Sequence, residues 1–229
     1  MARPKNQTAR REQLIRAASR AISAQGLSRL KVAGIADSAG VTRGSVHYYF
    51  RDLSELLIQV HKRALERFFT NRAAVAEATD DARDQLVESV RRGIPDGPDD
   101  ELAVVLCEFN TAIRDDPLFS TLTQSRYDRQ VTMYAAILEI GVAQGHFTLS
   151  EPATDVASNI VSLEDSYLLH IVSRNESLPP RRALELILSY ARTATGCPGL
   201  VPDRAPVLRP AVGGTEPEAG TEPEAGTEA

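Results

Sequence analysis

Residues 32–50 constrain the fold of this chain more than any other part of its sequence. Ile35 and Ala39 are four residues apart, a spacing that places both on one face of a short helix. Ala36 is small enough to let a second helix cross closely, and Gly40 follows where the chain must turn. Glycine adopts a left-handed backbone conformation at little cost, so this spacing predicts a helix, a tight turn and a second helix.

The second of these helices is expected over residues 43–49, with Thr42 as its N-terminal cap. Its inward face would consist of Val46, Tyr49 and Phe50. Its outward face presents hydrogen-bond donors, a glycine and no acid: Arg43, Gly44, Ser45, His47 and Tyr48. Arginine can read guanine through paired hydrogen bonds in the major groove of DNA, and hydroxyl or imidazole groups can contact phosphates. The pattern predicts a helix-turn-helix that binds duplex DNA; the alternative is an ordinary corner between two helices.

The distribution of charge supports the first interpretation. Residues 1–51 contain ten basic and two acidic groups, a net charge of +8, whereas residues 52–229 contain 16 basic and 29 acidic groups, a net charge of −13. A basic segment joined to an acidic body is typical of a polyanion-binding module attached to a second domain. We expect residues 1–9 to form a basic flexible arm ahead of the first helix.

The rest of the chain has the apolar spacing of helices, and signals for strands are nearly absent. A first helix is expected over 10–25, and Asp52 with Glu55 forms a capping box that would start a long helix. Further helices are expected at 80–92, 99–114, 117–144, 153–174 and 180–195. The sequence therefore predicts an all-α protein, with an N-terminal three-helix domain over 10–51 and a larger helical domain over 52–196.

The C-terminal segment differs in composition from the rest. After Cys197 the chain is rich in Pro, Gly and Glu, and Thr-Glu-Pro-Glu-Ala-Gly occurs at 215–220 and again at 221–226. Such a segment cannot bury enough apolar surface to offset the entropy of ordering. Residues 197–229 are therefore predicted to form a disordered tail.

Other classes of protein are not supported by the sequence. No apolar run approaches the ~18 residues of a membrane helix, and the first eleven residues are basic rather than hydrophobic. Cys107 and Cys197 lie far apart, which argues against a disulfide scaffold or a cysteine zinc site and fits a reducing cytoplasm. The four histidines lack metal-site spacing, and no nucleophile elbow or phosphate-binding glycine loop occurs. We expect a cytoplasmic protein that is not an enzyme and binds no cofactor or metal.

Residues 35–50, Ile-Ala-Asp-Ser-Ala-Gly-Val-Thr-Arg-Gly-Ser-Val-His-Tyr-Tyr-Phe, resemble the TetR family of transcriptional regulators. Later stretches resemble the carboxy-terminal domain of the BetI-type branch: Cys107-Glu108-Phe109, Asp116-Pro117-Leu118, 141–147 and 162–169. The resemblance implies about nine helices, a homodimer formed through the last two helices, and a small-molecule effector bound by the larger domain. It further implies that the effector shifts the fourth helix, so that a repressor leaves its operator. Two-fold symmetry makes that operator an approximate palindrome.

The residue pattern and the resemblance together assign DNA contacts to Lys31, Thr42, Arg43, Gly44, Ser45, His47, Tyr48 and Tyr49. Leu53 stands where the family usually has a phosphate-contacting lysine. Leu30 and Lys31 stand where the family usually has a threonine or serine cap, although Lys31 could itself contact phosphate. These departures leave open an alternative function, a helical small-molecule-binding or catalytic protein whose helix-turn-helix is vestigial.

Polar side chains within apolar helical segments are candidates for an effector pocket: Glu108, Asn110, Tyr127, Tyr134, Asn159, Asp165 and Tyr167. An unpaired carboxylate at Glu108 would be costly, because it follows a run of apolar residues. The effector is therefore predicted to be hydrophobic, with a cationic or hydrogen-bond-donating group that meets Glu108 or Asp165. The alternative is that these acids pair with arginines at positions 114, 126 or 129, or lie in the dimer interface.

Overall fold

The computed structural model describes residues 3–111 and 117–204, which contain α-helices, one short 3-10 helix and no strand. The all-α prediction is confirmed. The elements are α1 (Arg3–Gln25), η1 (Leu27–Arg29), α2 (Val32–Ala39), α3 (Arg43–Tyr49), α4 (Leu53–Ala78), α5 (Ala82–Gly93), α6 (Glu101–Thr111), α7 (Pro117–Ala143), α8 (Ala153–Val172) and α9 (Pro180–Thr195). None of the helices in these ranges combines the length and apolar character needed to cross a membrane.

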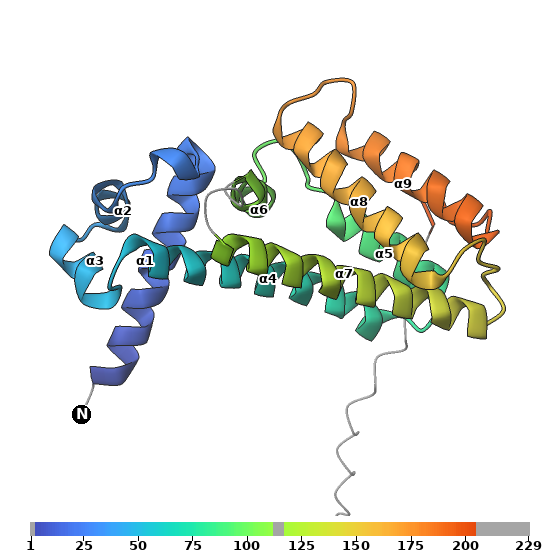
Figure 1. The fold of residues 1–229 in the computed structure, drawn as a ribbon, viewed down its shortest axis with the longest axis horizontal. Coiled ribbons are helices and arrows are strands. Elements are labelled where there is room, and N and C mark those ends of the chain that lie inside the picture. The colour runs from blue at the N-terminus through green and yellow to red at the C-terminus, as the bar shows by residue number, and fades with distance from the viewer. Residues whose placement is uncertain (1–2, 112–116, 205–229) are drawn as a thin grey trace, which may run out of the picture.

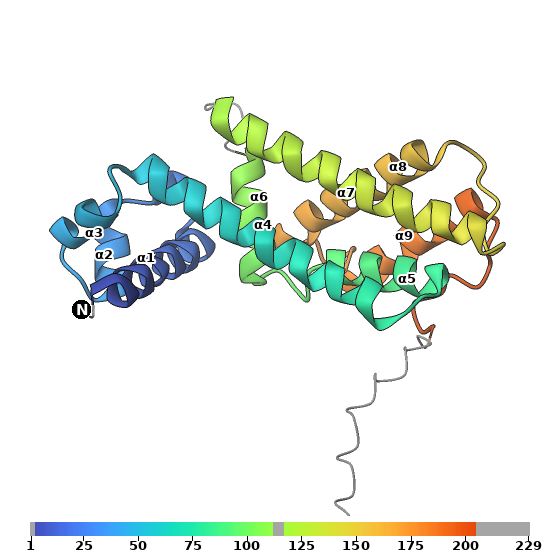
Figure 2. The same ribbon diagram turned by 90° about the horizontal axis from the view of Figure 1, so that it is seen from below.

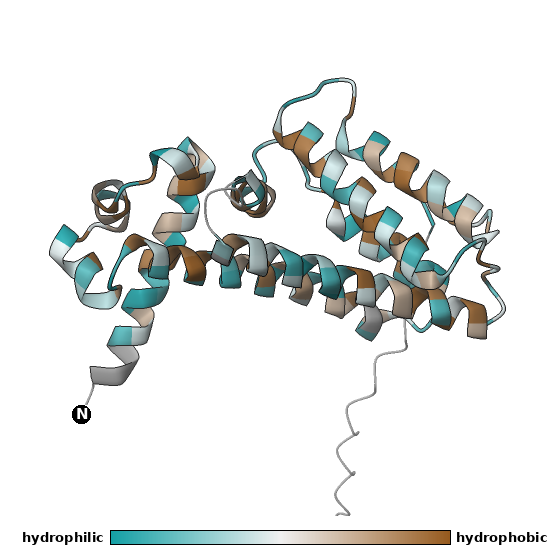
Figure 3. Ribbon diagram, viewed as in Figure 1, coloured by the Kyte–Doolittle hydropathy of each residue, from teal (hydrophilic) through white to brown (hydrophobic). Residues whose placement is uncertain are grey.

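The helices form two parts that α4 connects (Figures 1 and 2). At one end α1 packs on α4 and α2 packs on α1 and α3, while α5, α7, α8 and α9 pack together at the other end. α6 lies between the two parts and packs on α1 and α4 as well as on α7 and α8. Hydrophobic and hydrophilic residues alternate along the helices (Figure 3), so each helix buries one side and exposes the other.

Each part has its own apolar core. The core of the first part contains Leu14, Ile35, Val46 and Phe50, and Phe109 of α6 extends it toward the second part. The core of the second part joins α5 and the last three helices through residues such as Leu86, Leu138, Ile160 and Ile187. These residues lie at the helical spacings that the sequence predicts, which explains why helix positions were predictable within a few residues.

α4 begins with the predicted capping box. Asp52 Oδ1 accepts a hydrogen bond from the Glu55 amide at 2.8 Å, and Glu55 Oε2 accepts one from the Arg51 amide at 2.9 Å. The two carboxylates therefore satisfy amides at the start of the helix, where the backbone has no acceptor of its own. The fixed N-terminus ties the long helix to the part that contains α2 and α3.

The start of the chain differs from its prediction. Residues 1–9 were expected to form a flexible arm, but α1 begins at Arg3 and continues without interruption to Gln25. Pro4 lies in the first turn, where the missing amide breaks no helical hydrogen bond, so it does not stop the helix. The first two residues lie outside the described part of the chain.

The boundary of the tail also differs from its prediction. Leu200 is fully buried in the core of the second part, so the chain packs beyond Cys197. Arg204 forms ion pairs with Asp81 and Asp84, and the Leu200 carbonyl accepts a hydrogen bond from Arg192 at 2.8 Å. The predicted tail is therefore wrong for residues 197–204; the repeats at 215–226 lie outside the described residues.

Candidate nucleic-acid interface and effector cavity

The turn between α2 and α3 has the predicted geometry. Gly40 has φ 64° and ψ 38°, which is the left-handed conformation that glycine adopts most easily. Thr42 Oγ1 accepts a hydrogen bond from the Ser45 amide at 3.2 Å and so caps α3. Val46 is buried beneath the turn, which fixes the face that α3 turns outward.

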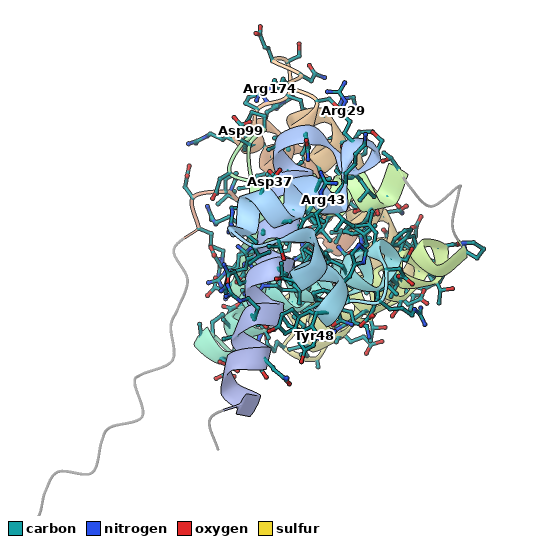
Figure 4. All side chains as sticks on the ribbon, turned by 90° about the vertical axis from the view of Figure 1, so that its left-hand side faces the viewer. Arg29, Asp37, Arg43, Tyr48, Asp99 and Arg174 are labelled. Carbon is teal, nitrogen blue, oxygen red and sulfur yellow. The ribbon has the colours of Figure 1, made fainter. Side chains whose placement is uncertain are left out.

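The outward face of α3 carries most of the predicted DNA contacts. Arg43, Gly44 and His47 are exposed, and Tyr48 is 72% exposed although it is aromatic. Figure 4 looks onto this end of the molecule and labels Arg43 and Tyr48, which come from the two ends of α3. No carboxylate in the described ranges forms an ion pair with Arg43, so its guanidinium is available to a ligand.

The other predicted contacts have different surroundings: Lys31, Thr42, Ser45 and Tyr49. Lys31 is exposed at the N-terminus of α2 and makes no side-chain capping bond, as its departure from the usual cap suggested. Thr42 is exposed and Ser45 is half-buried, and each takes part in capping α3. Tyr49 is half-buried and packs against the core of the first part, so it serves the fold as well as the surface.

Two α1 side chains that the pattern did not identify hold α2 and α3 in place. Arg11 Nη1 donates to the Tyr49 carbonyl at 2.6 Å, and the guanidinium lies 4.4 Å from the centre of the Phe50 ring. Gln13 Nε2 donates to the Ala39 carbonyl at 2.8 Å. These are the carbonyls at the C-terminal ends of α3 and α2, which otherwise lack intrahelical donors. α1 therefore positions both helices through their ends.

Leu53 occupies the position of the usual lysine and cannot contact phosphate through a charge. It is half-buried and packs against the core of the first part. The neighbouring Arg51 has an 85% exposed side chain, and its Nε donates to Asp52 Oδ2 at 2.9 Å. Arg51 is thus the exposed cation at this corner, although Asp52 offsets part of its charge. The sequence signal for it was only its place beside the capping box.

The seven predicted effector residues do not converge on one site. Glu108 Oε2 accepts a hydrogen bond from the Leu27 amide at 2.6 Å, so it joins α6 to η1, which follows α1. Asp165 forms two hydrogen bonds with Arg126, at 3.0 and 3.1 Å, which is the alternative that the sequence left open. Asn159 donates to the Tyr190 hydroxyl at 2.8 Å on the surface. Asn110, Tyr127 and Tyr167 are half-buried, and Tyr134 is fully buried.

Tyr134 belongs to a buried polar network that links α4, α7 and α8. Glu164 Oε2 accepts from Arg72 Nη2 at 2.8 Å, and Glu164 Oε1 accepts from the Tyr134 hydroxyl at 2.5 Å. Burial raises the pKa of Glu164, and Arg72 opposes that shift. Burial is the largest influence on Arg72 and disfavours its charged form, but the attraction of Glu164, Tyr134 and Asp165 and the hydrogen bond to Glu164 together outweigh it and raise the pKa of Arg72. Gly93 lies against this pair, at the C-terminal end of α5.

A cavity of about 300 Å³ lies between α4, α5 and α7, and Arg72 is in its wall. We call it the α4–α7 cavity. Its other polar lining residues are Gln85, Ser89 and Arg129, and the remaining lining is apolar, including Phe69, Met133 and Ile137. None of the seven predicted effector residues lines this cavity. The sequence signal that could have found it is the arginine that follows Phe68 and Phe69 by one turn of α4. Within the described residues, no group of three or more His, Cys, Asp or Glu could hold a metal ion.

Comparison with known proteins identifies the N-terminal domain. The sequence pattern described as "Bacterial regulatory proteins, tetR family" matches residues 14–60, which include the whole helix-turn-helix. Residues 14–60 thus match the DNA-binding domain of the TetR family. This confirms the resemblance predicted from residues 35–50.

Curated relatives carry related names. The chain is 41% identical over 93 residues to the HTH-type transcriptional regulator BetI of Stenotrophomonas maltophilia, a match that covers 40% of this chain and 45% of that protein. It is 25% identical over 145 residues to the HTH-type transcriptional repressor KstR2 of Mycolicibacterium smegmatis, covering 63% and 70% respectively. The chain thus spans less than half the length of the BetI regulator that it matches.

Solved structures share the fold. A putative transcriptional regulator from Saccharomonospora viridis, in complex with choline, has a TM-score of 0.77 at 21% identity and covers 82% of this chain and 98% of that one. A TetR regulator from Haloarcula marismortui has a TM-score of 0.75 at 23% identity, covering 82% and 99%. At these identities the likeness supports the fold alone.

Proposed function

We propose that this chain is a dimeric, ligand-responsive transcriptional regulator: a repressor that leaves a palindromic operator when a small hydrophobic effector binds the larger domain. The observation that carries the proposal is the outward face of α3, which is exposed, capped at Thr42 and free of acidic residues. In the proposed complex Arg43 reads a base, while Lys31, Ser45, His47 and Tyr48 contact phosphates or base edges. The N-terminus of α3 adds its own free amides toward the DNA.

A dimer through α8 and α9 would place two such faces on one duplex. Leu169 of α8 is 50% exposed, and Leu163, Tyr167 and Leu186 are only half-buried, so this surface retains apolar area for a partner. The hydrogen bond between Asn159 and Tyr190 holds the two helices together on their exposed side. Two-fold symmetry then requires two half-sites about one helical turn of DNA apart, or a multiple of it.

The signal from an effector would pass through α4 and α6. α4 runs from the part that contains α2 and α3 to the α4–α7 cavity. α6 contacts η1 through Glu108, which accepts from the Leu27 amide, and contacts α1 through Glu101, which accepts from the Ser19 hydroxyl at 2.6 Å. A shift of α4 or α6 would therefore move α2 and α3 relative to the dimer axis. The proposed domains are a DNA-binding domain ending at residue 51 and an effector and dimerisation domain beginning at residue 52.

A mobility-shift assay with DNA flanking the gene of this chain tests the proposal. Binding should weaken on the order of 10³-fold between low and physiological salt, because basic residues displace counterions from phosphates. Arg43→Ala should cost about 1–3 kcal/mol and relax sequence preference at one position of each half-site. Lys31→Ala is the matched control for a phosphate contact, and it should weaken binding to all sequences alike.

Two outcomes would contradict the proposal. Unchanged affinity and preference in Arg43→Ala would mean that α3 does not enter the groove. A protein that ignores duplexes of every sequence in dilute buffer would favour the alternative in which the helix-turn-helix is vestigial.

A further inference from the structure

The α4–α7 cavity has an unusual balance of charge. Two of its lining residues are arginines, Arg72 and Arg129, and no acid is among the described residues that line it. The other polar groups are the neutral side chains of Gln85 and Ser89. Most of the wall is apolar, and Ile140, which is 42% exposed, lies at its edge. The cavity thus combines an apolar wall with positive charge.

Arg72 retains hydrogen-bonding capacity that the protein does not use. Its side chain is completely buried, and only Nη2 is bonded, to Glu164. Within the described residues, Nε and Nη1 have no hydrogen-bond partner. A buried donor without an acceptor costs free energy, so an acceptor that enters from the cavity would remove an existing penalty. A cation has no acceptor to offer and would meet a like charge.

Arg129 supplies a second charge at the same cavity. Its guanidinium lies 3.9 Å from the centre of the Phe69 ring, and it forms no ion pair with any carboxylate in the described ranges. Glu164 balances Arg72 from outside the lining, whereas nothing in the lining balances Arg129. Arg129 is also exposed to solvent, so the positive charge at this cavity is accessible to a negatively charged ligand.

We propose that the α4–α7 cavity binds an amphipathic anion, a carboxylate attached to an apolar body, with the carboxylate at Arg72 and Arg129. The apolar body lies against Phe69, Met133 and Ile137. This replaces the expectation of a cationic effector, which depended on a free carboxylate at Glu108 or Asp165; both are bonded within the protein. That this anion acts as the effector rests on the proposed function, but that the anion binds in the cavity does not.

The test compares three ligands of equal chain length by titration calorimetry on the full chain without DNA: decanoate, 1-decanol and decyltrimethylammonium. Decanoate should bind most tightly and the ammonium ion least, because only the head group differs. Arg129→Gln should weaken decanoate binding about tenfold, the value of a lost charge-assisted hydrogen bond, and leave decanol binding unchanged. Ala136→Trp, which fills the cavity from α7, should abolish binding of both.

Arg67→Gln is the matched control, because Arg67 is an exposed arginine of α4 that does not line this cavity; it should leave decanoate affinity unchanged. The proposal is overturned if decyltrimethylammonium binds as tightly as decanoate, or if neither Arg129→Gln nor Ala136→Trp alters decanoate binding. Adding decanoate to the DNA complex then separates the two proposals. If the protein binds decanoate but no DNA, the proposed regulatory function is refuted and the proposed anion site is retained.

Discussion

Gly93→Ala tests whether the buried pair of Arg72 and Glu164 stabilises the fold. A Cβ atom at position 93 would lie within 3.0 Å of Arg72 Nη2 and of Glu164 Oε1, closer than real Cβ atoms come to other groups. Both side chains are held in buried positions and cannot withdraw into solvent. Separating a buried ion pair lowers the free energy of unfolding by about 3–5 kcal/mol, whereas replacing a helical glycine with alanine raises it by at most about 1 kcal/mol.

The net loss in the free energy of unfolding should therefore be about 2–4 kcal/mol. For a chain of this size that corresponds to a fall in Tm of about 4–16 °C, measured by circular dichroism at 222 nm. Gly34→Ala is the control, because Gly34 is also helical and its nearest neighbour would be 3.7 Å away; it should stabilise by about 0.5–1 kcal/mol. A Gly93→Ala protein that melts at or above the parent would refute the assignment of the pair.

Two further predictions concern stability. Burial, together with the charge of Arg126, lowers the pKa of His61 to about 4, whereas a histidine of the unfolded chain titrates near ~6.5. The unfolded state therefore binds more protons between these values, so stability is retained above about pH 6.5 and falls toward pH 4; thermal melts should show a smaller fall in His61→Leu. Leu200→Ala should cost about 2–5 kcal/mol in urea unfolding because Leu200 is fully buried, whereas Val201→Ala, at a 42% exposed side chain, should change stability by less than about 0.5 kcal/mol. Equal effects of the two substitutions would mean that residues 197–204 do not pack on the core.

The parts of the molecule that the sequence predicted are those set by neighbours along the chain. The left-handed Gly40, the cap at Thr42 and the capping box of Asp52 and Glu55 each involve residues at most four positions apart. Local spacing contains all the information that such features need. The positions of the helices followed from the same kind of pattern.

Apart from the start of α1, the errors concern contacts between residues that are distant in sequence. Glu108 meets the Leu27 amide, and Arg72 meets Glu164, across 81 and 92 positions respectively. Polarity within an apolar run indicated that Glu108 had a partner, but not which one. Leu200 lies in a short segment that contains Pro and Gly, so composition assigned it to the tail, although its side chain is buried in the core of the second part.

The hydrogen bonds from α1 to the ends of α2 and α3 have a consequence for how the DNA sequence recognised by such a regulator can change during evolution. Arg11 and Gln13 donate to backbone carbonyls, and Glu108 accepts from a backbone amide of η1, so none of these contacts depends on the outward side chains of α3. If these side chains contact DNA as proposed, new residues at positions 43, 44, 47 or 48 would change the DNA sequence that is recognised while the contacts between the helices stay the same. In the proposed regulator, the choice of target DNA and the response to an effector would thus depend on separate sets of atoms.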